Sequence, residues 1–118
     1  MEIIMGYRSD VGFALPLKEA VILNNKFKEL NCYNLFENMD DKKEIQFCGE
    51  TWMVYEWGWI KWYSCYPEVQ TIENYMSKKD SQYCFIRIGE DINDNEEHFD
   101  NDLDENIFYV NRVISYNY

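Results

Sequence analysis

The sequence contains no run of about 18 apolar residues, so no segment is expected to span a membrane. Its first residues, MEIIMGYRSD, lack the cationic stretch and apolar core of a secretory signal. Glycine and proline are also scarce, with 5 and 2 among 118 residues. Hydrophobic residues make up 47% and aromatic residues 18%. This composition predicts one compact domain over residues 1–118 rather than a disordered chain.

The residues that usually carry catalysis or bind metal are also few. The chain has one histidine, His98, so no Ser-His-Asp set can be assembled. No Gly-rich phosphate loop and no H-E-x-x-H motif occurs. Four cysteines, at 32, 48, 65 and 84, form no C-x-x-C pair, and we expect them to be reduced thiols that mostly pack in the core. We therefore predict no enzymatic activity, no catalytic residue, no cofactor and no metal.

Periodicity predicts alternating strands and helices along the chain. The predicted strands are 3–14, Glu44–Cys48, Thr51–Trp57, Tyr83–Ile88 and Ile107–Ser115. Gly58 supplies a turn or a bulge, after which Trp59–Tyr63 continues extended. Pro16 and Pro67 each suit the first position of a helix, and apolar spacing predicts helices over 16–31 and 67–78. The order β-α-β-β-α-β-β indicates an α+β fold: a mostly antiparallel sheet of about five strands with two helices on one face.

Lysine and arginine are absent from residues 90–106, which we predict to form an acidic loop. This segment contains nine carboxylates: Glu90, Asp91, Asp94, Glu96, Glu97, Asp100, Asp102, Asp104 and Glu105. The whole chain has 22 acidic and 11 basic residues, a net charge of −11. Without the nine acids, 13 acidic residues face 11 basic ones, a net charge of −2. The negative charge is therefore local, and it should repel nucleic acids and membranes while attracting basic protein surfaces.

Three interpretations of the acidic segment stay open. It could be a solvated loop, or it could be a surface that contacts a basic partner. It could also bind calcium, because Asp91, Asn93, Asn95 and Asp102 partly imitate a calcium loop. However, Glu96 stands where that loop needs glycine, and Asp102 replaces its final bidentate glutamate. His98 has no second histidine and no cysteine at metal spacing, so we interpret it as a surface residue.

Aromatic residues gather within residues 52–66, which hold four tryptophans and three tyrosines. Single-stranded nucleic-acid binders stack bases on such rings but add a cationic groove, and here Lys61 is the sole base inside the stretch. We therefore expect no direct nucleic-acid binding. Some rings should pack in the core, and those left exposed among Trp57, Trp59, Trp62 and Tyr63 should anchor a protein partner.

Three stretches, taken together, resemble a family of small, mostly uncharacterised phage and prophage proteins. They are MGYRSDV at Met5–Val11, KWYSCYPEVQTIE at Lys61–Glu73 and FIRIGED at Phe85–Asp91. Members of that family often begin MGYRSDV, so translation here starts at either Met1 or Met5. The resemblance carries no activity, but it implies a phage or mobile-element gene expressed in the cytoplasm of a bacterial host.

This context favours a protein that inhibits host defence. The analogy is with acidic anti-CRISPR proteins, which present carboxylates where a nucleic-acid backbone would lie. We expect the chain to bind a basic bacterial protein, such as a CRISPR effector, through the nine acids and the exposed rings. The alternative is a small-molecule binder that sequesters a nucleotide immune signal in an aromatic pocket, with Arg8, Lys61 or Arg87 holding the phosphate.

Overall fold

Five antiparallel strands form one sheet, in the order β2-β3-β1-β4-β5, in the computed structural model of the chain. The structure describes residues 6–100 and 107–108. The strands are β1 (Ser9–Pro16), β2 (Asp41–Phe47), β3 (Glu50–Ile60), β4 (Cys84–Gly89) and β5 (Asn95–Phe99). The helices α1 (Leu17–Leu30) and α2 (Pro67–Ser77), with a short 3-10 turn at Leu35–Glu37, complete the fold. The predicted α+β class and element order are confirmed.

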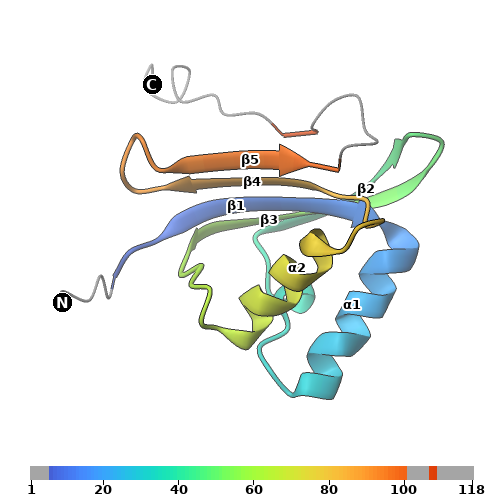
Figure 1. Cartoon of the computed structure of the whole chain (residues 1–118), viewed down its shortest axis with the longest axis horizontal. Coiled ribbons are helices and arrows are strands. Elements are labelled where there is room, and N and C mark those ends of the chain that lie inside the picture. Colours follow the sequence, from blue (N-terminus) through green and yellow to red (C-terminus); the bar gives the residue numbers. More distant parts are fainter. Residues whose placement is uncertain (1–5, 101–106, 109–118) are drawn as a thin grey trace.

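Both helices cover the same face of the sheet, as Figure 1 shows. In α1 the buried residues are Ala20, Leu23 and Phe27, three and four apart, which is the spacing of one helical face. They pack with strand residues of alternating register into the main core. At its centre the Phe36 ring stacks on Tyr55 with centroids 4.1 Å apart, and Phe27 meets Phe36 edge-on at 5.2 Å. Aromatic rings therefore form much of this core.

The opposite face of the sheet, which we call the open face, carries a smaller apolar cluster. Its buried members are Ala14, Trp52, Val54 and Cys84, and Phe99 and Phe108 pack against them. A Cβ added to Gly12 would lie 2.7 Å from the Phe108 ring, so glycine lets that ring rest directly on β1. Residues 107 and 108, which the sequence predicted to begin a strand, are not in one. Most of that predicted strand, residues 109–115, lies outside the described residues.

The fifth strand is instead β5, inside the segment predicted as an acidic loop. Residues Asn95–Phe99, NEEHF, pair antiparallel with β4, with Arg87 opposite Glu96 and Phe85 opposite His98. The two strands and their turn, from Cys84 to Phe99, form a hairpin at the edge of the sheet. The expectation of a continuous loop over 90–106 is therefore wrong for Asn95–Phe99, whereas residues 90–94 form the turn of the hairpin. In the described part of the chain, neither helix is long and apolar enough to cross a membrane.

Candidate binding surface

The predicted acidic residues are partly used by the protein itself. Asp94 forms a 2.7 Å ion pair with Arg87, and Glu96 contacts the same guanidinium at 3.3 Å. Glu90 accepts a 2.6 Å hydrogen bond from the backbone N–H of Arg8. Asp91 accepts one from the backbone N–H of Asn93 at 2.9 Å, which closes the hairpin turn. These carboxylates therefore help to hold the hairpin in place, while Glu90, Asp91 and Glu96 remain exposed.

The remaining members of the predicted set divide into two groups. Glu97 is exposed on β5, on the open face, and Asp100 is half-buried, with its backbone N–H donating to the carbonyl of Tyr83. Asp102, Asp104 and Glu105 lie outside the described residues. Within residues 6–100 and 107–108, no group of three or more His, Cys, Asp or Glu side chains is placed to hold a metal ion.

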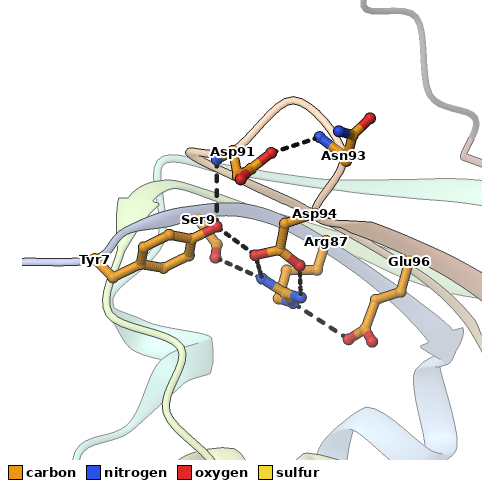
Figure 2. A network of polar contacts seen from close by, with 7 residues as sticks. All are labelled: Tyr7, Ser9, Arg87, Asp91, Asn93, Asp94 and Glu96. Carbon is orange, nitrogen blue, oxygen red and sulfur yellow. Dashed lines mark hydrogen bonds and ion pairs between the residues drawn. The ribbon is translucent and has the colours of Figure 1, made fainter. Parts of the chain in front are cut away.

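Arg87 is the centre of a polar network, which we call the Arg87 network, drawn in Figure 2. Its guanidinium lies between Asp94 and Glu96 and also donates to the Ser9 hydroxyl at 3.1 Å. The Tyr7 hydroxyl donates to Asp94 and accepts from the Asp91 backbone N–H. The hydrogen bond to Asp94 raises the pKa of Tyr7, and the same carboxylate raises the pKa of Arg87. The network fastens the β4–β5 hairpin to the start of β1, so Arg87 is not free to hold a phosphate.

The four predicted aromatic anchors have different environments. Trp57 and Trp62 are 2% and 9% exposed and belong to the main core, and the Trp57 indole donates to the Leu35 carbonyl at 3.0 Å. They therefore cannot be surface anchors. Tyr63 is half-buried, and its hydroxyl donates to the Tyr7 carbonyl at 3.1 Å. Trp59 is 63% exposed and is the ring that fits the expected role.

A β-bulge pushes Trp59 outward. Ser9 pairs with Ile60 and Val11 pairs with Trp57, so β3 has one residue more than β1 between these two pairs. This agrees with the prediction of a turn or bulge at Gly58, although the strand continues only to Ile60. The left-handed residue is Trp59, with φ of 57°, which is unusual for a bulky side chain. Such strain costs on the order of 1–3 kcal/mol and persists only where neighbouring contacts hold it.

Two carboxylates hold the bulge. Asp40 accepts from the backbone N–H of Gly58, and Asp10 accepts from that of Trp59 at 2.8 Å. Both carboxylates also line a hollow of about 450 Å³ on the open face, together with Asp41 and Glu56. We call this the acidic hollow. Its floor is apolar, formed by Ile86, Ile88 and Phe108, and no Lys or Arg lines it among the described residues.

The sheet register places the acids of this hollow together. Asp41 lies directly opposite Glu56 across β2 and β3, and Glu56 pairs in turn with Gly12. None of the four carboxylates forms an ion pair within residues 6–100 and 107–108. Sequence reasoning missed this group because its members come from three separate parts of the chain. The composition of a short segment reveals only carboxylates that are close in sequence. The carboxylates of this group come together only when β1, β2 and β3 pair.

Comparisons of the chain with protein-family models, with curated proteins and with solved structures find no match. The site must therefore be interpreted from its own geometry. That geometry combines four carboxylates on the open face, which have no ion-pair partner among the described residues, with the exposed Trp59, whose strained backbone donates its N–H to Asp10.

Proposed function

We propose that the protein is a phage or mobile-element accessory protein that inhibits a nucleic-acid-handling defence protein of its bacterial host. It acts in the host cytoplasm by stoichiometric binding, without catalysis. Its partner presents a basic surface, as a CRISPR effector does. The observation that carries this proposal is the acidic hollow, whose four carboxylates have no ion-pair partner among the described residues, together with the exposed Trp59, whose backbone N–H donates to Asp10.

The carboxylates of the acidic hollow are suited to contact a partner whose surface normally binds phosphates. Arginine and lysine side chains that hold a nucleic-acid backbone also accept carboxylates, with charge-assisted hydrogen bonds. Carboxylates alone increase the association rate and the specificity more than the affinity, because the cost of their desolvation offsets much of the electrostatic attraction. An indole that becomes buried on binding supplies the apolar contribution, and tryptophan is enriched among the residues that dominate interfaces.

The fold accounts for two of these acids, Asp10 and Asp40, which hold the bulge. Among the described residues, the side chains of Asp41 and Glu56 have no hydrogen bond or ion pair that would account for them. Like charges directly opposite each other on neighbouring strands are destabilising, and Asp41 and Glu56 have that relation. The left-handed backbone of Trp59 is a second local cost. Two unfavourable features at one end of the sheet are understandable if that end serves a binding role. Function and stability commonly oppose each other in this way.

Affinity purification with matched variants tests the proposal. The wild-type protein is immobilised and exposed to bacterial lysate at low and at high salt, in parallel with a D41N/E56Q variant and a W59A variant. The control is D80N/E29Q, which removes the same charge far from the hollow, because Asp80 follows α2 and Glu29 lies on α1. Any protein that is retained is then tested for nucleic-acid binding in the presence of the immobilised protein.

We expect a salt-sensitive partner that loses its nucleic-acid binding when it is captured. The D41N/E56Q variant should retain less of it and show a weaker salt dependence. Loss of a central tryptophan typically costs about 2 kcal/mol or more, so W59A should weaken binding at least about 30-fold. Equal capture by all four proteins, or a captured partner that still binds its nucleic acid, would refute the proposal.

A further inference from the structure

Within the part of the chain that the structure describes, the Arg8 side chain has no carboxylate partner, although the chain has twice as many acids as bases. Among the described residues, this side chain makes one polar contact, a weak 3.4 Å hydrogen bond to the carbonyl of Trp59. No ion pair within the described ranges includes it. The backbone around it is nevertheless well held, because Glu90 accepts from its N–H and Tyr63 donates to the preceding carbonyl. A fixed backbone with an unengaged guanidinium is suited to receive an anion.

Arg8 lines two hollows, of about 280 and 540 Å³, which share Tyr33 and Ile60 as well. We call them together the Arg8 hollow. Lys61 lines the smaller part, and Trp59 lines the larger part. The structure thus brings together two of the three cations that the sequence suggested for holding a phosphate. The third, Arg87, is occupied by Asp94 and Glu96 in the Arg87 network.

The start of α2 adds to the positive character of the smaller part. Tyr66 is the N-cap residue and makes no side-chain capping hydrogen bond, and Pro67 follows it. Tyr66, Glu68 and Val69 all line this part of the hollow. The first N–H groups of the helix therefore lack a side-chain acceptor, and the helix dipole favours an anion there. Glu68 opposes this in the smaller part, where it faces two cations and the end of a helix. Two further carboxylates line the larger part: Glu37, which is paired with Lys28 at 3.9 Å, and Asp40, which accepts from the Gly58 backbone N–H.

The walls of the Arg8 hollow are aromatic and apolar. Tyr33 and Trp59 are exposed large rings, 52% and 63% accessible. Tyr66 and Ile60 contribute further surface. Ligand sites commonly combine such apolar walls with a few converging polar groups in a volume of about 300–1,000 Å³. Exposed rings next to cations are also the combination on which nucleobases stack while their phosphates are held.

We propose that the Arg8 hollow binds a free nucleoside monophosphate. The guanidinium of Arg8 and the ammonium of Lys61 hold the phosphate, and the base stacks against Tyr33 or Trp59. An arginine fork matches phosphate oxygens in two parallel hydrogen bonds, which lysine cannot do. This site adjoins the acidic hollow, with which its larger part shares Asp40, Trp57 and Gly58, and it extends beyond the proposed inhibition of a defence protein.

Thermal unfolding and calorimetric titration with AMP, GMP, CMP and UMP test the site at low ionic strength. A ligand that binds only the folded state raises Tm, and the rise grows with the logarithm of the ligand concentration once that concentration exceeds Kd. Inorganic phosphate and adenosine serve as separate arms, because each supplies one half of the ligand chemistry. The variants are Arg8→Gln and Lys61→Gln, with Lys79→Gln as the matched control, since Lys79 is exposed and lines no described hollow.

We expect at least one monophosphate to raise Tm and to bind more tightly than phosphate or adenosine alone. Arg8→Gln and Lys61→Gln should each weaken binding of the monophosphate about tenfold or more, as the loss of a charged hydrogen bond does. Lys79→Gln should leave this binding unchanged. The D41N/E56Q variant should bind the nucleotide as the wild type does, which separates this site from the acidic hollow. The inference is overturned if no monophosphate raises Tm at millimolar concentration, if both site variants respond like the wild type, or if phosphate alone gives the full effect.

Discussion

Gly89 should be intolerant of the smallest possible side chain, because the Arg87 network leaves no room for one. The residue ends β4, and its backbone N–H donates to the Asp94 carbonyl at 2.7 Å. A Cβ added there would overlap both the Asp94 carboxylate and the Tyr7 hydroxyl, at distances that real Cβ atoms do not show. Gly89→Ala therefore forces apart the contact that joins the hairpin to residue 7.

The size of the effect follows from the overlap. Overpacking of this kind costs about 1–3 kcal/mol. At about 2.1 cal/mol/K per residue, the 118 residues have an unfolding entropy of about 250 cal/mol/K, so each kcal/mol lowers Tm by about 4 °C. We expect Gly89→Ala to lower Tm by about 4–12 °C in a thermal scan followed by far-UV circular dichroism.

A second glycine provides the control, and a second substitution tests the mechanism. A Cβ added to Gly6 would meet nothing within 4 Å, so Gly6→Ala should leave Tm nearly unchanged. In a Tyr7→Phe background one of the two overlapping oxygens is gone. The cost of Gly89→Ala should then be smaller, with a coupling of about 0.5 kcal/mol or more. If Gly89→Ala behaves like Gly6→Ala, or if its cost is the same in both backgrounds, the steric explanation is refuted.

Two further predictions concern the sheet and its core. Glu56→Gln removes the like charge opposite Asp41 and should raise the free energy of unfolding by a few tenths of a kcal/mol in urea titration. Glu44→Gln is the control, because Glu44 lies opposite Met53, and it should leave the free energy of unfolding unchanged. A loss of stability in Glu56→Gln would count against the argument. Burial raises the pKa of Tyr55 from 10.0 to about 12, so its contribution to stability is complete below pH 10.0 and is lost as the pH rises toward 12. Alkaline unfolding should therefore be less steep in Tyr55→Phe than in the wild type, and identical pH profiles would contradict the assignment.

The helices and most strands were predictable because their signals are local. Apolar spacing and Pro67 predicted a helix over 67–78, and α2 spans Pro67–Ser77. The strand predicted over Tyr83–Ile88 is β4, Cys84–Gly89, displaced by one residue. In both cases the apolar pattern within the segment is the same pattern that the core selects. Local preference and tertiary packing favour the same structure in these two segments, so the sequence alone is sufficient to predict them.

The strand β5 was not predictable from such signals. Its sequence, NEEHF, has two adjacent glutamates and no alternation of apolar and polar residues. It is a strand because β4 offers an edge and because Arg87 neutralises Asp94 and Glu96 across the pair. Sequence also does not distinguish the buried Trp57 and Trp62 from the exposed Trp59. Their stretch reads as uniformly aromatic, and the neighbouring Trp59 differs from them only because an extra residue in β3 turns it outward.

Residues from three parts of the chain meet at one corner of the sheet: Tyr7 and Arg8, then Tyr63, then Glu90 and Asp91. Tyr7 contacts Asp94 and Tyr63, and Arg8 contacts Glu90 and Trp59, so one short segment joins the hairpin to the residues after the bulge. Figure 1 shows the start of β1 and the β4–β5 turn at the same end of the sheet. The bulge at Gly58 and Trp59 lies at this corner, between the acidic hollow and the Arg8 hollow.

The two proposed sites meet at the bulge, but mutations away from the bulge can separate them. Asp40 and Gly58 line both hollows, whereas Glu56 lines the acidic hollow and Arg8 and Trp59 line the other. Trp59 serves both proposals, since it anchors a partner in one and offers a stacking surface in the other. A change at Trp59 should therefore weaken both activities, while Glu56→Gln and Arg8→Gln should each affect one. A nucleotide stacked on this indole would also compete with a protein that buries it, because a single ring face cannot be occupied twice.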